Sequence, residues 1–192
     1  FLDITGRNDW SSALVYTDGT GNYSYFYPSV SGSWLFSETF NTPSWITLGK
    51  LRASWAEVGS DTSPYTLNKG YGSGTIEDGG GFVYTNSVNT TLVDRSIKPE
   101  RKNSIEIGAD LRFFGNRLGV DVAYYDETIS EQIGSVPLPS YSGYSSLFTN
   151  IGTLTNSGFE LTLTGTPVRT EDFSWNSTFI YSNNKTVIDK VH

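Results

Sequence analysis

The acidic side chains are the residues of this sequence best suited to acid–base chemistry. Adjacent pairs occur at Glu77–Asp78 and Asp126–Glu127, and Glu100 stands between them in the sequence. A glycosidase holds two carboxyl groups about 5–9 Å apart across the bond it cleaves, and no spacing here fixes such a pair. We interpret these groups as solvated charges in loops and at strand ends. We therefore expect no catalytic residue and no enzymatic activity.

The other reactive residue types are scarce. The 192 residues include no Cys, and the single His is the last residue. These counts exclude disulfides, thiolate metal sites, cysteine nucleophiles and histidine triads. The glycine runs at 70–74 and 79–81 do not follow a strand and open a helix, as a dinucleotide site requires. We expect no metal and no cofactor.

The charge balance bears on the partners. There are 13 Lys and Arg against 20 Asp and Glu, which gives a formal net charge of −7. A nucleic-acid binder needs basic residues for phosphate, so we expect no nucleic-acid partner.

Aromatic residues in the expected loops are the candidate binding groups. Their faces can stack on sugar rings or on peptide side chains, and Tyr and Trp also suit wet interfaces in general. Alternatively, they form an aromatic girdle at a membrane boundary, or they pack loops against one another or against a partner. The candidate substrate-binding residues are Trp10, Tyr65, Tyr71, Tyr84, Tyr141 and Tyr144.

These side chains must be positioned by β-strands, because apolar residues recur with period 2 and no stretch keeps a helical period. The pattern predicts about seven antiparallel strands in an all-β meander. In several strands one face is apolar and the other is polar or small. The apolar positions that we expect to face lipid, if the sheet is a barrel wall, are Ile105, Ile107, Leu111, Leu118, Val120, Val122, Phe159, Leu161 and Leu163.

The connections alternate between short and long. Residues 114–117 and 166–172 are expected to be short turns at one end of the sheet, and 37–46 is intermediate. Residues 8–23, 59–103 and 130–155 are expected to be long loops at the other end. Short turns at one end and long loops at the other are typical of outer-membrane barrels. The alternation of the strands alone leaves a soluble extracellular β-sandwich that binds carbohydrate open as an alternative, and a β-rich glycosidase as a weaker one.

Several short motifs follow one another in a collinear order. They lie at residues 2–12 (ending in Arg-Asn-Asp-Trp-Ser-Ser), 27–34, 37–38, 51–59, 98–101, 105–108, 116–118, 124–125, 136–139, 150–152 and 156–161. In this order they resemble the barrel of SusC/RagA-type TonB-dependent outer-membrane transporters, over nearly the whole chain. The sequence contains no Met, no plug domain, no TonB box and no closing aromatic strand, so residues 1–192 are expected to be a late section of a larger transmembrane β-barrel.

The resemblance implies a function. It implies import of oligosaccharides or peptides across the outer membrane of a Gram-negative bacterium, energised through TonB. It also implies a SusD-like surface lipoprotein as the outer partner and outer-membrane lipid around the wall, with TonB acting on parts of the protein that are absent from this chain.

Overall fold

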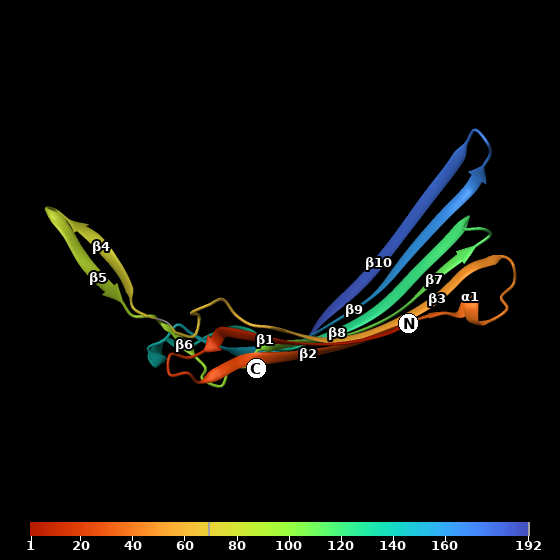
Figure 1. Cartoon of the computed structure of the whole chain (residues 1–192). Coiled ribbons are helices and arrows are strands. Elements are labelled where there is room, and N and C mark those ends of the chain that lie inside the picture. The colour runs from red at the N-terminus through yellow and green to blue at the C-terminus, as the bar shows by residue number, and fades with distance from the viewer. Residues whose placement is uncertain (69, 192) are drawn as a thin grey trace.

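The computed structural model describes residues 1–68 and 70–191, and its main feature is one curved sheet of seven long strands (Figure 1). The strands lie in the order β1-β2-β3-β7-β8-β9-β10, and every neighbouring pair is antiparallel. This confirms the all-β meander and the number of long strands. Their bounds are β1 (Leu2–Val15), β2 (Gly21–Leu35), β3 (Ile46–Ser60), β7 (Glu100–Phe113), β8 (Leu118–Pro137), β9 (Ser146–Arg169) and β10 (Ser174–Val191).

Smaller elements fill two of the connections. Helix α1 (Phe36–Thr39) follows β2, and a short 3-10 helix (Ser140–Ser142) follows β8. Between β3 and β7 the chain forms a separate hairpin of β4 (Gly72–Asp78) and β5 (Gly81–Ser87), and then β6 (Thr91–Val93), which pairs in parallel with β9. In Figure 1 the β4–β5 hairpin projects away from the main sheet.

The short turns lie where the sequence predicts them. The β7–β8 turn at residues 114–117 has positive φ at Phe114, Gly115 and Asn116, which Gly and Asn adopt readily. The β9–β10 turn lies at the same end of the sheet, because β8 runs antiparallel to both β7 and β9. The prediction that these two turns share an end is therefore confirmed.

The prediction of three long loops is largely wrong. Strand β1 continues to Val15, β8 continues to Pro137 and β9 begins at Ser146, so only residues 16–20 and 138–145 connect these strands. Residues 59–103 hold the β4–β5 hairpin and β6. The reason is that these strand ends mix apolar and polar residues without the regular alternation that identified the rest.

Within residues 1–68 and 70–191, the sheet is a single layer with no hydrophobic core beneath it. The buried apolar cluster of the described chain consists of Leu14, Leu67 and Ile97, and it lies at the end of the long connections. A β-sandwich would bury one face of the sheet against a second sheet. Here apolar side chains of the sheet remain exposed, so the sandwich architecture is wrong.

No helix within residues 1–68 and 70–191 has the length and apolar character needed to span a membrane.

Candidate functional site

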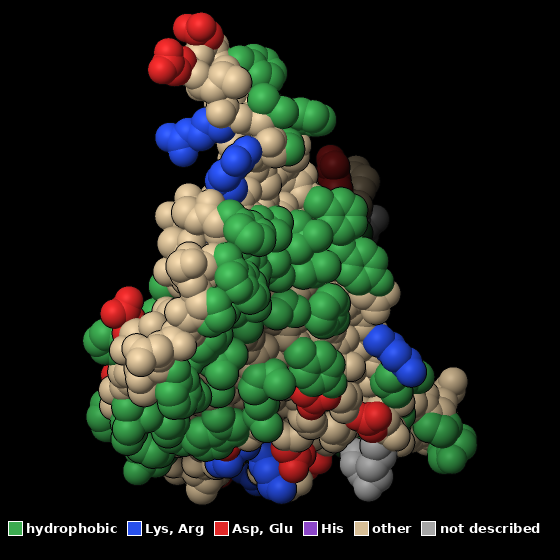
Figure 2. Space-filling view, turned by 90° about the vertical axis from the view of Figure 1, so that its right-hand side faces the viewer, with side chains coloured by type: hydrophobic (Ala, Val, Ile, Leu, Met, Phe, Trp, Pro, Cys, Tyr) green, Lys and Arg blue, Asp and Glu red, His purple; other side chains and the backbone are tan. Residues whose placement is uncertain are grey.

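One face of the sheet is apolar across all seven strands, and we call it the apolar face. The strand register aligns Leu111, Val120 and Leu163 in one row and Val122 with Leu161 in the next. Side chains of directly opposite residues point to the same face, so alternation along each strand places all nine predicted residues on this face. Figure 2 shows a broad hydrophobic surface with charged side chains mostly at its margins.

The apolar face has two chemically distinct borders. Toward the long connections, the row of Ile105 continues into Asp126 on β8 and Ser157 on β9. Toward the short turns, Trp45 stacks on Phe113, with 5.7 Å between ring centroids. From Phe113 to Ile105 the strand rises about 27 Å, or about 21 Å with a tilt near 40°. That height is close to the apolar band of about 25 Å on outer-membrane barrels.

The opposite, polar face carries an ion-pair cluster that crosses three strands. The Arg52 guanidinium on β3 donates two hydrogen bonds to the Asp121 carboxylate on β8, at 3.1 and 2.9 Å, and pairs with Glu106 on β7 at 3.4 Å. The Arg52 side chain passes over Gly108, where an added Cβ would lie 2.7 Å from its Nε. Glycine at 108 therefore permits the contact between β3 and β8, which are not neighbours in the sheet.

A segment at the end of the long connections joins distant strands, and we call residues 94–100 the strap. On one side it binds the β1–β2 hairpin. The Tyr16 hydroxyl donates to the Asp94 carbonyl at 2.7 Å, and the Asn22 amide donates to the Ile97 carbonyl at 3.1 Å. The Ile97 side chain is buried against Leu14.

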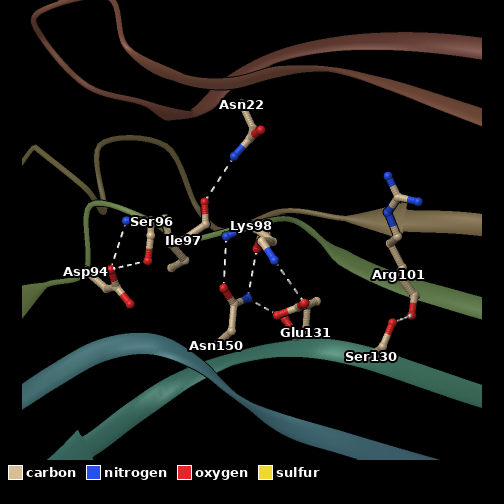
Figure 3. A network of polar contacts seen from close by, with 9 residues as sticks. All are labelled: Asn22, Asp94, Ser96, Ile97, Lys98, Arg101, Ser130, Glu131 and Asn150. Atoms are coloured by element: carbon tan, nitrogen blue, oxygen red, sulfur yellow. Dashed lines mark hydrogen bonds and ion pairs between the residues drawn. The ribbon is translucent and has the colours of Figure 1, made fainter.

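On its other side the strap binds β8 and β9 (Figure 3). The Asn150 side chain accepts from the Lys98 amide at 2.9 Å and donates to the carbonyls of Lys98 and Glu131. Glu131 lies at a β-bulge with φ +56, and its carboxylate pairs with the Lys98 ammonium at 3.4 Å. The strap therefore connects the two sides of the sheet at this end.

Between β2 and β3 the sheet opens into a cleft. The last paired residues are Ser29 on β2 and Ala56 on β3. The next residue of β2 toward its N-terminus is Pro28, which has no N–H to donate. Beyond this point β2 pairs only with β1, and β3 only with β7. The opening encloses about 760 Å³. Its lining residues are Asn8, Asn22, Ser24, Tyr25, Phe26, Tyr27, Pro28, Glu57, Gly59, Lys98, Pro99, Glu100, Arg101, Ser130 and Glu131.

Two tyrosines fill the gap between the separated strands. Tyr25 and Tyr27 stack with 6.4 Å between ring centroids, and the Tyr25 hydroxyl donates to the Asn22 carbonyl at 2.7 Å. Burial, with a smaller contribution from Asp61, raises the pKa of Tyr25 to about 12. An added Cβ at Gly59 would lie 2.6 Å from the Tyr27 ring, so residue 59 must be small to admit that ring.

The structure does not bring the six predicted loop aromatics together. Trp10 lies on β1 and lines a smaller hollow beside Tyr25 and Tyr27. The other five are spread over the loop after β3, the β4–β5 hairpin and the β8–β9 connection, and they stay a prediction as binding residues. Their exposed fractions are Tyr65 81%, Tyr71 78%, Tyr84 85%, Tyr141 92% and Tyr144 40%.

Sequence reasoning missed the residues that form the cleft. Tyr25 lay just beyond the loop predicted at 8–23, Tyr27 entered only as the start of the motif at 27–34, and only Pro28 signalled a break in the ladder. Lys98 and Arg101 entered only as part of a motif with no role, and Glu100 was considered only as a solvated acidic residue. Within the described residues, no group of three or more His, Asp or Glu side chains is arranged to hold a metal ion.

Known proteins match the chain over almost its whole length. Residues 1–190 match the family model described as TonB dependent receptor-like, beta-barrel. TonB-dependent receptor P26 of Formosa agariphila is 31% identical over 97% of this chain, and SusC of Bacteroides thetaiotaomicron is 24% identical over 98%. The chain spans about a fifth of these relatives, at 19% of each.

Solved structures agree on the fold. The structure of the RagAB peptide transporter matches 98% of this chain and 20% of its own, with a TM-score of 0.78 and 24% identity. The siderophore receptor PirA of Pseudomonas aeruginosa matches 84% of this chain with a TM-score of 0.52. With a family model that covers residues 1–190 and a single curved antiparallel sheet, this chain belongs to the β-barrel family of TonB-dependent receptors.

Proposed function

We propose that this chain is a wall section of an outer-membrane importer in a Gram-negative bacterium. One observation carries the proposal: a one-layer sheet exposes a continuous apolar face and confines its ion-pair cluster to the opposite face. A surface of this kind is stable when lipid covers the apolar side and a polar lumen lies behind the other. Membership of the TonB-dependent receptor family supports this orientation.

Import is the function that this arrangement supports best. The substrate class is an oligosaccharide or a peptide, captured between the outer ends of the strands and the lumen. Loops mounted on a rigid wall are common recognition surfaces, and here the β4–β5 hairpin and residues 138–145 would supply them. Energy comes from TonB, which acts on parts of the protein outside this chain, and a SusD-like surface lipoprotein is the outer partner. The role is transport without bond chemistry, and it requires no catalytic residue.

The orientation of the wall can be tested by site-directed labelling of the full-length protein. This segment has no Cys, so single cysteines at Leu161 and Thr162 report on adjacent positions of opposite faces. Each is labelled with a small fluorophore in lipid vesicles. Quenching by lipid-attached spin labels should be strong at 161 and weak at 162, whereas aqueous iodide should show the reverse order. The same quenching at both positions would remove the basis for a lipid-facing wall.

Import itself is tested by uptake into cells. Cells that express the full-length protein should accumulate a labelled oligosaccharide or peptide from their natural nutrient source, and deletion of TonB should abolish accumulation. The proposal would be contradicted if the protein assembles in the outer membrane but deletion of its gene leaves the uptake of both substrate classes unchanged.

A further inference from the structure

The cleft between β2 and β3 lies next to the apolar face and largely on the same side of the sheet. Phe26 pairs with Asn8 in the register that also pairs Ile4 with Val30, so alternation places all four on the apolar face. Glu57 and Arg101 share that face with Ile105 on the neighbouring pair of strands. The cleft therefore begins where the apolar positions of these strands end.

Both cations of the cleft are paired with carboxylates, and one further carboxylate remains. Arg101 pairs with Glu57 at 3.1 Å, and Lys98 pairs with Glu131 at 3.4 Å. The Glu100 carboxylate accepts a hydrogen bond from the Ile133 amide at 2.8 Å. Two cations face three carboxylates, so the lining does not favour a phosphate or another anion. An uncharged ligand with many hydrogen-bonding groups fits this balance.

The remaining lining combines an aromatic surface with amides and hydroxyls. The Phe26 ring is 62% exposed and rests over Gly6, where an added Cβ would lie 3.1 Å from the ring. Asn8 donates to the Ser24 hydroxyl at 3.0 Å. An aromatic face packs against the apolar side of a pyranose ring, and nearby amides and charged groups bond its hydroxyls. A volume of about 760 Å³ lies within the range of about 300–1,000 Å³ of ligand pockets.

We propose that this cleft binds a neutral saccharide, with Phe26 as the stacking platform and Asn8, Glu57 and Arg101 as hydrogen-bonding groups. The proposal rests on the proposed function, which places the cleft at the outer edge of a membrane. A neutral saccharide can come from two sources there. One is the carbohydrate headgroup of a glycolipid in the outer leaflet, and the other is a free oligosaccharide at the outer surface of the wall.

The test uses the purified full-length transporter and two probes. The first is cellohexaose, a soluble neutral oligosaccharide, and the second is phosphatidylcholine vesicles with and without digalactosyldiacylglycerol, a neutral glycolipid. Phe26→Ala should lower affinity for at least one probe by about tenfold, as expected when about 1.4 kcal/mol of stacking is lost. Phe26→Tyr should restore binding. Tyr124→Ala removes an exposed aromatic of the apolar face outside the cleft and should leave both affinities unchanged.

The outcomes distinguish the two sources of saccharide, and they distinguish this inference from the proposed function. A loss confined to the glycolipid vesicles identifies a glycolipid headgroup, and a loss confined to cellohexaose identifies a free oligosaccharide. Asn8→Ala keeps the ring and should weaken binding by about threefold, so it tests the cleft even if Phe26→Ala fails to assemble. Unchanged affinity for both probes in Phe26→Ala and Asn8→Ala would overturn the assignment. Uptake is measured separately, so import without saccharide binding in the cleft would refute only this inference, and binding without import would refute only the proposed function.

Discussion

Val120 is a position at which the orientation of the wall can be tested directly. It lies in the middle of the apolar residues of β8, between Leu118 and Val122, and its register neighbours are Leu111 and Leu163. An Arg at this position has no acidic neighbour on the same face, because Asp121 points to the opposite side. The Arg side chain must cross lipid to reach water from this row, which lies two residues inside the border formed by Phe113 and Leu118. We therefore expect Val120→Arg to oppose insertion.

The magnitude follows from the depth of the residue. A charged side chain on a lipid-facing barrel surface costs about 2–4 kcal/mol at the midplane and about 0–1 kcal/mol near the interfaces, so at Val120, between the two, we expect about 1–2 kcal/mol. Each 1.4 kcal/mol is a factor of ten, so the folding equilibrium in lipid should fall by about 5- to 30-fold. The matched control is Thr162→Arg on the polar face, where Asp121 is the cross-strand neighbour. That change should cost less than about 0.5 kcal/mol, and Ala123→Ser should be nearly silent.

The assay is refolding of the full-length barrel into phosphatidylcholine vesicles, with guanidinium titration to obtain the free energy of unfolding. Outer-membrane abundance in cells is measured in parallel. Destabilisation by Val120→Arg alone is the expected result. If Val120→Arg and Thr162→Arg lower stability equally, or if neither does, the apolar face does not meet lipid and the reasoning fails.

Three further outcomes are expected. Deletion of residues 72–87, which form the separate β4–β5 hairpin, should leave barrel abundance unchanged and reduce uptake or partner binding, measured by growth on the cognate nutrient; normal growth would place recognition elsewhere. Gly108→Ala should destabilise the barrel by about 1–3 kcal/mol in a denaturant titration, because its Cβ would meet the Arg52 guanidinium, whereas Gly80→Ala, with open space around it, should be neutral. Hydrogen bonds from Thr149, and to a smaller extent from Ser96, hold the pKa of Asp94 below its ordinary value of 3.8. The stability that Asp94 contributes is therefore present above that pH and is lost as the pH falls through the lowered pKa. Asp94→Asn should reduce this loss of stability at acid pH, measured as the free energy of unfolding against pH.

The sequence predicts the strands best where the two faces differ. Ile105 and Ile107 alternate with Glu106 and Gly108, so strand, face and neighbours all follow from a period of 2. The ends toward the long connections could not be predicted in the same way. Residues 146–150 of β9 read Ser-Leu-Phe-Thr-Asn and border polar stretches, so no amphipathic pattern distinguishes strand from loop there.

The β4–β5 hairpin carried a signal that the prediction did not use. Residues 79–81 form a glycine turn, and Ile76 and Val83 flank it in register, which is a usual hairpin pattern. The Arg52–Asp121 pair and the cleft had no such signal. Each depends on register and strand separation between residues far apart in the sequence, which only the assembled sheet determines.

The strap also has a consequence for the order of folding. Its hydrogen bonds join residues 78 apart at Tyr16 and Asp94, 75 apart at Asn22 and Ile97, and 52 apart at Lys98 and Asn150. Contacts between such remote residues form only after the intervening loops have closed. The β7, β8 and β9 strands must therefore be aligned before the strap can settle against them. Protection of the strap amides from hydrogen exchange should therefore appear late in folding. Its appearance would show that the strands of this section have reached their final register.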